Sequence, residues 1–370
     1  MQIARIGDGA TEQYSPDLVG GKAANLARMA ALGLPVPAAF VLPISLCAAT
    51  LNSEARAKQD LMDGLTEGIE FLENATGRRL GDRRRPLLVS VRSGAARSMP
   101  GMLDTVLNVG CSATAARGLV RMTGHPRFAN DCRRRFLDSY GSVVLGIDPV
   151  TFTRKRDALI AAEGVADERT LDSEALERLA ASYEQVIEDE QHVLSDDPME
   201  QLRAAAQSVF RSWMSERART YRKLERLDYL QGTAVTVQAM VFGNAGISSG
   251  AGVAFSRDPS TGADKPVIDV LFESQGEDVV SGGHNPETEE TIVRTLPAVA
   301  AQLRDALRRL EQDFADVQDV EFTIENGKLW ILQTRAAKRT PQAALRLAID
   351  FVKEKRITHG EALQRLMGVA

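Results

Sequence analysis

The sequence predicts a mixed helix and strand fold, in which α+β or α/β lobes surround a helical insert. Short apolar runs with the length of β-strands lie toward both ends of the chain, whereas apolar residues in its middle recur at helical spacing. At 370 residues, the chain is long enough for two or three folding units, each with its own core. Strands near both ends with helices between them indicate lobes of this kind.

The N-terminal part alternates between helix and strand. Its first helix is rich in strong helix formers and ends at Gly33, with Pro35 just beyond. The elements expected here are a helix at 22–32, a short strand at 38–42, helical structure at 45–80 and a strand at 87–91.

Residues 111–230 are expected to be mainly helical, because apolar residues such as Leu176, Leu179 and Tyr183 recur at helical spacing. Arginine clusters in this stretch, such as 133–135, are expected to lie on solvated helix faces.

From Ala234 onward the pattern changes to strands separated by one helix that ends near Phe314. The expected strands are 234–242, 252–255, 267–273, 319–325 and 328–333, and residues 341–370 return to helix. The expected domain-like segments are an N-terminal lobe at 1–110, a helical insert at 111–230, a C-terminal lobe at 231–340 and C-terminal helices at 341–370.

The composition excludes several functional classes. The net charge of −5 argues against a general nucleic-acid binder. No apolar run reaches the roughly 18 residues that cross a bilayer, and the N-terminus has no basic-then-apolar signal segment. Cys47, Cys111 and Cys132 lack CxxC spacing, which argues against a disulfide scaffold and a zinc ribbon. We therefore expect a cytoplasmic protein without a membrane or nucleic-acid partner.

Two segments rich in small residues are candidate phosphate sites. The loop from Arg92 to Gly101 follows an apolar strand, and its small residues let backbone N–H groups approach an anion. Arg92 and Arg97 would add charge-assisted contacts, although a plain surface loop explains the pattern equally well. The segment 20–22, Gly-Gly-Lys, opens a helix, where a lysine can bind phosphate but is more often simply exposed.

A hairpin is expected around Asn326-Gly327, which separates two strand-like runs. A two-residue loop would put Glu321 and Gln333 on opposite faces. A three-residue loop ending in a Gly bulge, which pairs Ile324 with Lys328, would put them on the same face. A slip of one residue moves every side chain to the other face, so only one register can be right.

We expect the three-residue loop, because its register sorts both faces. It pairs Asp319 with Gln333 and Glu321 with Ile331. Its core face carries Val320, Phe322, Ile324, Trp330 and Leu332, and its polar face carries Asp319, Glu321, Gln333 and Arg335. Two carboxylates and an amide oxygen are hard ligands suited to Mg²⁺, and the arginine could neutralise a phosphate. A hairpin that simply faces solvent is the alternative.

Two further segments give weaker signals. Glu277 and Asp278 follow a glycine turn and could be ligands or part of a hydrated loop. Gln238 and Met240 interrupt an apolar strand and could line a base pocket, although such residues more often belong to an edge strand or a core.

Together these segments resemble the pyruvate, phosphate dikinase family. The most specific stretch runs from Val89 to Asn108. The other stretches follow in the family's order, at 19–26, 233–244, 255–262, 275–280, 319–324 and 332–340. The resemblance is to the nucleotide-binding part of the dikinase, which has an ATP-grasp fold shared with phosphoenolpyruvate synthase. It implies two α+β lobes that clasp the nucleotide, with a helical insert.

The resemblance implies ATP and Mg²⁺ as ligands and assigns roles at matching positions. Phosphate contacts and catalysis would involve Lys22, Arg92 and Arg335, and the loop carrying Arg97, Ser98 and Gly101 would cover the phosphates. The adenine would lie at Gln238, Met240 and Val241, with Glu277 as a further nucleotide-binding residue. Glu321 and Gln333 would bind Mg²⁺, with Asp319 at the ribose or metal side.

The whole dikinase adds a phosphohistidine domain and a pyruvate-binding barrel, and the Thr-Gly-Gly stretch that leads to its Ser-His is absent here. The contexts of His125, His192, His284 and His359 are unrelated, so each is expected to be structural or exposed. Residues 282–286 replace the family's usual Gly-x-Arg-Thr-Pro, and an arginine is lost there.

We therefore expect a Mg-ATP-dependent phosphotransferase module that transfers a phosphoryl or pyrophosphoryl group to a histidine of a separate partner protein. The alternatives are a standalone kinase of a small molecule, a non-catalytic nucleotide-binding regulatory module, and an excised domain of a longer protein.

Overall fold

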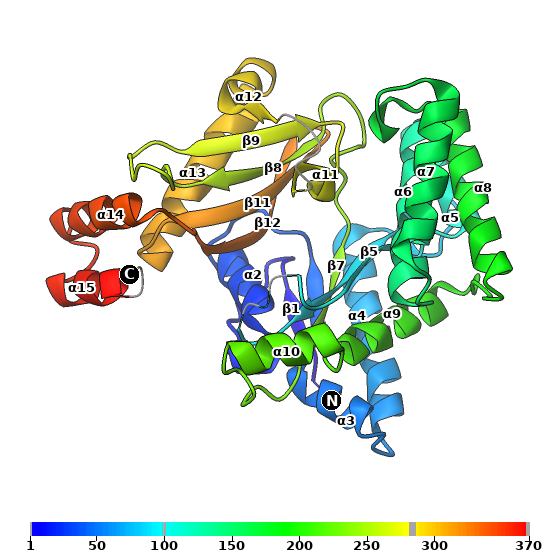
Figure 1. Ribbon diagram of the computed structural model, residues 1–370, viewed down its shortest axis with the longest axis horizontal. Helices are drawn as coiled ribbons and strands as arrows, with labels where there is room; N and C mark the ends of the chain where they lie inside the picture. Colours follow the sequence, from blue (N-terminus) through cyan, green and yellow to red (C-terminus); the bar gives the residue numbers. More distant parts are fainter. Residues whose placement is uncertain (1, 98, 100, 281–285, 368–370) are drawn as a thin grey trace. The chain divides into compact units, whose positions relative to one another are not determined.

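The chain divides into two compact units (Figure 1). The structure, a computed structural model, describes residues 2–97, 99, 101–280 and 286–367. Unit 1 comprises residues 1–31 and 37–240, and unit 2 comprises residues 32–36 and 241–370. Each contains helices and an antiparallel sheet, so the predicted α+β class is confirmed. The four domain-like segments expected from the sequence stay predictions.

Unit 1 begins with short elements and continues into a helical region. Its strands are β1 (Ala4–Ile6), β2 (Ala39–Leu42), β3 (Arg79–Leu80), β4 (Pro86–Leu87), β5 (Val89–Gly94), β6 (Thr105–Val109) and β7 (Ala234–Ala239). Its helices are α1 (Pro16–Val19), α2 (Gly21–Ala31), α3 (Ile44–Leu51), α4 (Ala57–Thr76), α5 (Ala113–Thr123), α6 (Pro126–Val143), α7 (Pro149–Glu163), α8 (Ser173–Asp189), α9 (Pro198–Ser212) and α10 (Glu216–Leu224), with a short 3₁₀ helix at Glu168–Thr170.

The main sheet of unit 1 has the order β1-β2-β7-β5-β6, with antiparallel neighbours throughout. Phe40, Val237, Val91 and Val106 lie side by side across four of its strands and are fully buried. Helix α4 approaches this row closely, because a Cβ at Gly68 would overlap the ring of Phe40. The face of the sheet that carries these four residues is thus part of the core. The residues that alternate with them along each strand lie on the opposite face.

The arginine cluster of α6 is buried, which corrects the expectation of a solvated helix face. Arg134 Nη2 lies 2.7 Å from Asp131 Oδ1, and Arg135 Nε lies 3.0 Å from Asp131 Oδ2. Arg133 donates to Glu184 Oε1 of α8 at 2.7 Å. These guanidinium groups face acidic residues inside the helical region, including one that is distant in sequence, and local patterning cannot reveal such a partner.

Unit 2 is a second sheet with helices. Its strands are β8 (Gly250–Phe255), β9 (Val267–Phe272), β10 (Glu287–Thr288), β11 (Gln318–Glu325) and β12 (Lys328–Ala336), in the sheet order β10-β9-β8-β11-β12. Its helices are α11 (Gly276–Val280), α12 (Glu289–Thr295), α13 (Pro297–Phe314), α14 (Pro341–Lys353) and α15 (His359–Met367). Buried side chains on one face of β11, which include Val320, Phe322 and Ile324, form part of the core.

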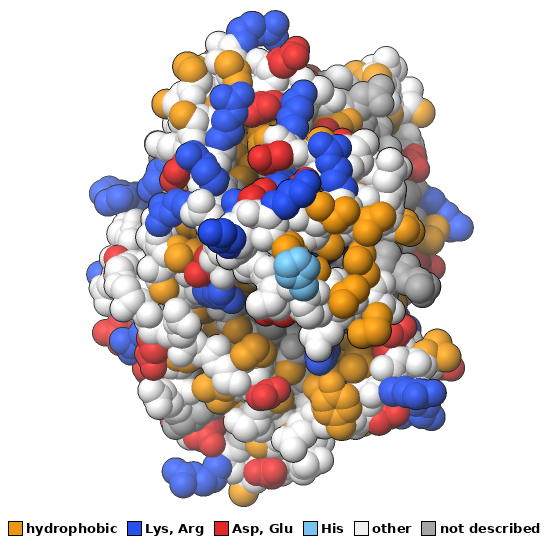
Figure 2. Space-filling model, turned by 90° about the vertical axis from the view of Figure 1, so that its left-hand side faces the viewer, with side chains coloured by type: hydrophobic (Ala, Val, Ile, Leu, Met, Phe, Trp, Pro, Cys, Tyr) orange, Lys and Arg blue, Asp and Glu red, His pale blue; other side chains and the backbone are white. Residues whose placement is uncertain are grey.

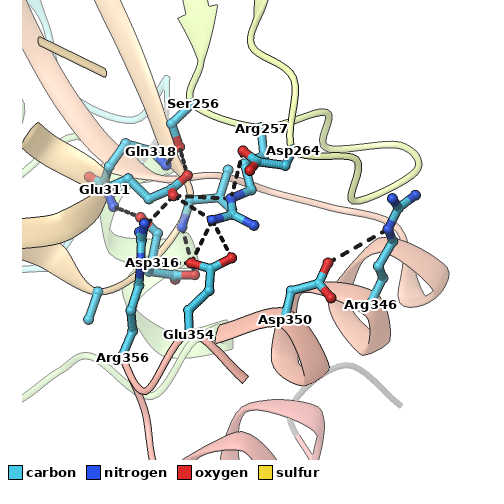
Figure 3. Close-up of polar contacts among 12 residues, drawn as sticks. Ser256, Arg257, Asp264, Glu311, Asp316, Gln318, Arg346, Asp350, Glu354 and Arg356 are labelled. Carbon is cyan, nitrogen blue, oxygen red and sulfur yellow. Dashed lines mark hydrogen bonds and ion pairs between the residues drawn. The ribbon is translucent and has the colours of Figure 1, made fainter. Parts of the chain in front are cut away.

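A buried ion network joins α14 to the rest of unit 2 (Figure 3). Arg257, which follows β8, is 2% exposed, and its Nε donates to Glu311 Oε1 of α13 at 3.0 Å. Its Nη2 donates to both carboxylate oxygens of Glu354 at 2.9 Å. Arg356 completes the network with a 2.7 Å bond to Glu311. The conspicuous 255–262 segment of the sequence therefore has a structural function, in addition to any part in a site.

Helices α14 and α15 enclose a small core of their own with Val317 and Ala337. Figure 2 faces the side of the molecule on which these two helices lie, and it shows hydrophobic side chains gathered at the surface. The exposed large hydrophobic residues of α14 and α15 are Leu345, Ile349, Leu363 and Met367.

Several predicted boundaries differ from the structure. Strand β5 extends to Gly94, so Arg92 belongs to a strand and the following loop begins at Ala95. Strand β7 ends at Ala239, three residues earlier than expected. The sequence patterns gave no indication of β1, β6 and β10, which are short or carry polar residues.

The three cysteines are buried and free, and burial raises the pKa of Cys47 to about 11 and that of Cys111 to about 12. Such thiols are poor nucleophiles at neutral pH. Within the described part of the chain, no helix combines the length and apolar character needed to cross a membrane.

Candidate functional site

The two phosphate-site candidates of the sequence lie against each other in unit 1. Gly20 has a φ of 81°, and a Cβ at this position would overlap the carbonyl of Gly94 at the end of β5. The next residue, Gly21, donates its N–H to the carbonyl of Ala95 at 2.9 Å. Only glycine permits this close approach of two backbones. The start of α2, with Lys22 exposed in its first turn, is therefore fixed beside the loop that follows Arg92.

Arg92 lies on the sheet face opposite the apolar core row. It pairs with Thr236 of β7, and Ser90 pairs with Gln238 two residues along. Arg92 Nε and Thr236 Oγ1 are both buried and have no hydrogen-bond partner among the described residues. An unsatisfied buried donor costs about 1–3 kcal/mol, and more for a charged group. The face therefore presents a cation and a hydroxyl whose hydrogen-bonding capacity suits an anionic ligand.

The predicted adenine-binding residues, at the end of β7 and just after it, are buried or half-buried. Gln238 is 4% exposed and donates from Nε2 to the carbonyl of Pro37 at 3.3 Å. Met240 is half-buried just after β7, and its N–H donates to the Leu88 carbonyl at 2.9 Å. Its predicted neighbour Val241 is buried but belongs to unit 2.

In the loop after β5, Arg97 and Gly101 are exposed. Gly101 has a φ of 69°, a left-handed conformation that favours glycine, and a Cβ there would meet nothing within 4 Å. Ser98 lies outside the described residues. Arg97 and Gly101 are therefore accessible to a ligand.

The hairpin of unit 2 corrects the predicted register. Glu325 pairs with Lys328, so the loop has two residues, and both Asn326 and Gly327 have positive φ, at 49° and 75°. This is the geometry that joins two strands in a tight hairpin. The register then shifts by one residue beyond the Phe322–Ile331 pair, where an extra residue, Leu332, forms a bulge.

This bulge determines which side chains share the polar face. Beyond it, Glu321 pairs with Gln333 and Asp319 pairs with Arg335, whereas the predicted pairs were Glu321 with Ile331 and Asp319 with Gln333. The four polar residues do share a face, as expected. The core partners on β12 are Leu329, Ile331 and Thr334, which are buried, and Trp330 and Leu332 are only half-buried.

Asp319 and Glu321 are each in contact with their partner on β12. Gln333 Nε2 lies 3.4 Å from Glu321 Oε1, and Arg335 Nε donates to Asp319 Oδ2 at 2.8 Å. The Asp319 side chain is 9% exposed and that of Arg335 is 50% exposed. Asp319 Oδ1 is buried without a partner among the described residues. A carboxylate oxygen in this state is an acceptor available to a cation or to a ligand hydroxyl.

The donor set fits a magnesium ion. Glu321 and Gln333 supply a carboxylate and an amide oxygen, with Asp319 two residues away on the same face. In the described residues, no three His, Cys, Asp or Glu side chains form a cluster able to hold a metal. A cation bound by Glu321 and Gln333 would therefore take further ligands from water or phosphate, and Mg²⁺ binds in this way.

Glu277 lies in the first turn of α11 and is exposed. The turn before it is fixed by Asp278, which accepts the N–H of Gln275 at 2.9 Å, and Gln275 Nε2 donates to Asn244 Oδ1 at 2.8 Å. Asp278 is therefore a capping residue here and not part of a hydrated loop. The segment 282–286, where the sequence lacks the family's usual arginine, lies outside the described residues except for Pro286.

Comparison with known proteins supports the resemblance. The chain matches the family "Pyruvate phosphate dikinase, AMP/ATP-binding domain" over residues 53–300 and 284–356. The chain belongs to this family. It is 43% identical to a pyruvate, phosphate dikinase of Clostridium symbiosum over 352 residues, 95% of this chain and 40% of that protein. It is 40% identical to pyruvate, phosphate dikinase 2 of Zea mays over 367 residues, 98% of this chain and 41% of that protein.

The chain therefore spans about 40% of the length of the curated relatives that it matches. The family match, together with the mixed helix and sheet content, is consistent with an ATP-grasp α+β fold.

Sequence reasoning missed other polar residues on these faces. Asp269 of β9 pairs with Val253, which pairs with Glu321, so Asp269 lies in the same row of the sheet as the predicted metal ligands. An aspartate inside the apolar strand 267–272 was a detectable signal. Thr236, two residues before Gln238, gave no such signal because threonine is common in strands.

Proposed function

We propose that this chain binds Mg-ATP and acts as the nucleotide-binding part of a dikinase-type phosphotransferase. The observation that carries the proposal is the coincidence of unsatisfied polar atoms with positions that match the family. Arg92 Nε in unit 1 and Asp319 Oδ1 in unit 2 are each buried without a partner among the described residues, and each could be satisfied by a polar group of a ligand.

In the proposed complex, unit 1 contacts the phosphates and the base. Lys22, at the start of α2, and Arg92 neutralise phosphate charge, while backbone N–H groups of the loop that carries Arg97, Ser98 and Gly101 cover the phosphates. Gln238 and Met240 hold the adenine. From unit 2, Val241 would contact the adenine and Glu277 the nucleotide. The proposal draws support from the contact between the start of α2 and the loop after β5.

Unit 2 would hold the metal and support transfer. Glu321 and Gln333 bind Mg²⁺, which supplies charge neutralisation at the phosphates, and Asp319 accepts from the ribose or a metal-bound water. Arg335 projects from β12 with half of its side chain exposed and contributes positive charge where the transferred group carries negative charge. Positioning and charge neutralisation, rather than covalent chemistry by this chain, would account for catalysis.

We propose further that the acceptor is a histidine of a separate protein. The pyrophosphoryl group of ATP would be transferred to the histidine nitrogen, with AMP as the leaving group. Inorganic phosphate would then accept the γ-phosphoryl, which leaves the β-phosphoryl on the histidine. Support comes from the chain's own histidines. His125 is the N-cap of α6, His192 follows α8 and His359 opens α15, and none of the three belongs to a segment that resembles the dikinase's phosphohistidine motif.

The test follows label from ATP marked at the β-phosphorus. The full chain is incubated with Mg²⁺, phosphate and a phosphohistidine-domain protein, and acid-labile label on that protein together with AMP is the expected result. Glu321→Gln should abolish the label, whereas the matched control Glu325→Gln, on the same strand beside the turn, should not. ATP binding without any transfer would favour a non-catalytic nucleotide-binding module, and label on an added small molecule would favour a small-molecule kinase.

A further inference from the structure

A cluster of exposed arginines lies on unit 1, at the end of β5 that is remote from the phosphate-site loop. The segment 77–86 contains five arginines and one acidic residue, Asp82, and α5 adds two arginines and no acidic residue. We call six of these the basic knob, defined by Arg79, Arg83, Arg84, Arg85, Arg117 and Arg121. All six are exposed.

The backbone beneath the knob is fixed. Asp82 Oδ1 accepts the N–H groups of Arg84 and Arg85 at 2.6 and 2.8 Å, which closes the turn between β3 and β4. Arg121 Nη1 donates to the Arg83 carbonyl at 3.1 Å, which joins α5 to that turn. Helix α5 also packs closely here, since a Cβ at Gly118 would lie 2.9 Å from the Arg83 carbonyl carbon. The arginines therefore project from a rigid base.

The arginines of the knob outnumber the acidic residue beside them, Asp82, which interacts electrostatically with Arg79 and Arg83. No carboxylate among the described residues forms an ion pair with any of its six guanidinium groups, and the carboxylate of Asp82 is used by backbone N–H groups. Some exposed arginines elsewhere do have acidic partners, such as Arg217 with Asp104 and Arg178 with Glu163. Six exposed arginines on one turn and one helix give this surface a positive potential, which attracts an anionic partner.

We infer that the basic knob is a docking surface for an acidic segment of a partner protein. A guanidinium group binds a carboxylate through two parallel hydrogen bonds, so several arginines on one rigid turn and one helix face suit several carboxylates. A nucleic acid fits less well. Residues 77–125 contain no Phe, Trp or Tyr on which bases could stack, and the net charge of −5 opposes a polyanion that extends beyond the knob.

This proposal stands independently of the nucleotide site. The proposed phosphate contacts of unit 1 are Lys22 in α2, Arg92 in β5 and the loop after Gly94, whereas the knob lies on the segment 79–85 and on α5. The two sets share no residue, so loss of one function need not affect the other.

The test measures binding of a fluorescent oligo-glutamate peptide to the full chain by anisotropy at physiological ionic strength. The triple variant Arg83→Glu, Arg84→Glu, Arg85→Glu should bind the peptide about tenfold or more weakly. A control variant with the same change in net charge, Arg294→Glu, Arg304→Glu, Arg308→Glu in α12 and α13, should bind as the parent does. If the triple variant misfolds, the milder double variant Arg117→Gln, Arg84→Gln replaces it in the test. This variant keeps the hydrogen bond from Arg121 to the Arg83 carbonyl, and its affinity for the peptide should lie between those of the parent and of a chain without the knob.

Any one of three results would overturn the inference. The first is that the parent chain does not bind the peptide, and the second is that the control variant loses binding as strongly as the knob variant. The third is that a duplex RNA binds the knob as tightly as the peptide does. The last result would make the knob a general polyanion surface.

Discussion

Removal of Arg335 should separate catalysis from stability. In the folded chain its Nε lies 2.8 Å from Asp319 Oδ2, and half of the arginine side chain is exposed. An exposed ion pair is worth at most about 1 kcal/mol. Arg335→Ala also leaves the nearly buried carboxylate of Asp319 without the arginine that donates to it, at a cost of about 1–3 kcal/mol. We therefore expect a modest loss of stability.

The effect on phosphoryl transfer should be larger. An arginine that stabilises the charge of a transferring phosphoryl group contributes about 10³-fold or more, which corresponds to about 4 kcal/mol. Arg335→Ala should therefore lower the rate of label transfer from ATP by about 10³-fold, while calorimetry shows ATP binding within about tenfold of the parent.

A second variant distinguishes the two effects. In Arg335→Ala, Asp319→Asn the unpaired charge is gone, so urea unfolding should recover most of the lost stability while transfer stays absent. If Arg335→Ala turns over normally, the catalytic assignment is wrong. If transfer returns together with stability in the double variant, the arginine has only a structural role.

Three further predictions concern the scaffold. Burial raises the pKa of the Asp131 carboxyl, but the charges of Arg135 and Arg134 more than offset this, so its pKa lies well below the usual range. The ionised carboxylate therefore stabilises the folded state above about pH 4, and this stabilisation is lost as the pH falls through the lowered pKa. Asp131→Asn should lower the free energy of unfolding by about 3–5 kcal/mol at neutral pH. In a series of urea unfolding curves, the midpoint of the variant should also fall less steeply at acid pH than that of the parent. Asn108 has a φ of 53° and a buried amide without a partner, so Asn108→Gly should be tolerated while Asn108→Ala costs about 1–2 kcal/mol, by urea unfolding. Glu311→Gln removes the charge shared by two arginines of the network in Figure 3 and should make α14 and α15 markedly more sensitive to protease; unchanged cleavage would contradict this.

Local patterns in the sequence predicted much of the fold and failed where distant residues decide. Helical spacing and turn residues located α2, α13 and the hairpin at Asn326-Gly327. The register of that hairpin was predicted wrongly because a bulge at Leu332 leaves no mark in the alternation of polar and apolar residues. The polar face was nevertheless predicted correctly. The bulge shifts the register by one residue, which returns Gln333 and Arg335 to the face of Glu321 and Asp319, although with other cross-strand partners than predicted.

The sequence also failed to predict which charged residues pair with each other. Arg133 was expected to face solvent, and its partner Glu184 lies on another helix that no local pattern connects to it. The same limit applies to Asp269. Its position in the same row as Glu321, with Val253 of β8 between them, depends on strand order and not on spacing in the sequence. The sequence indicated the glycine segment at 20–22 and the loop after Arg92 as two separate phosphate-site candidates, but it did not indicate that Gly20 packs against Gly94.

Titration calorimetry of ATP in the presence and absence of Mg²⁺ tests the central claim most directly. Saturable binding is expected for the parent chain with Mg²⁺, and binding should weaken strongly in Glu321→Gln, while Glu325→Gln binds as the parent does. A ligand that binds only the folded state at about 100 times its Kd should also stabilise the chain by about 2.7 kcal/mol. Absence of ATP binding, or equal binding with and without Glu321 and Mg²⁺, would contradict the account.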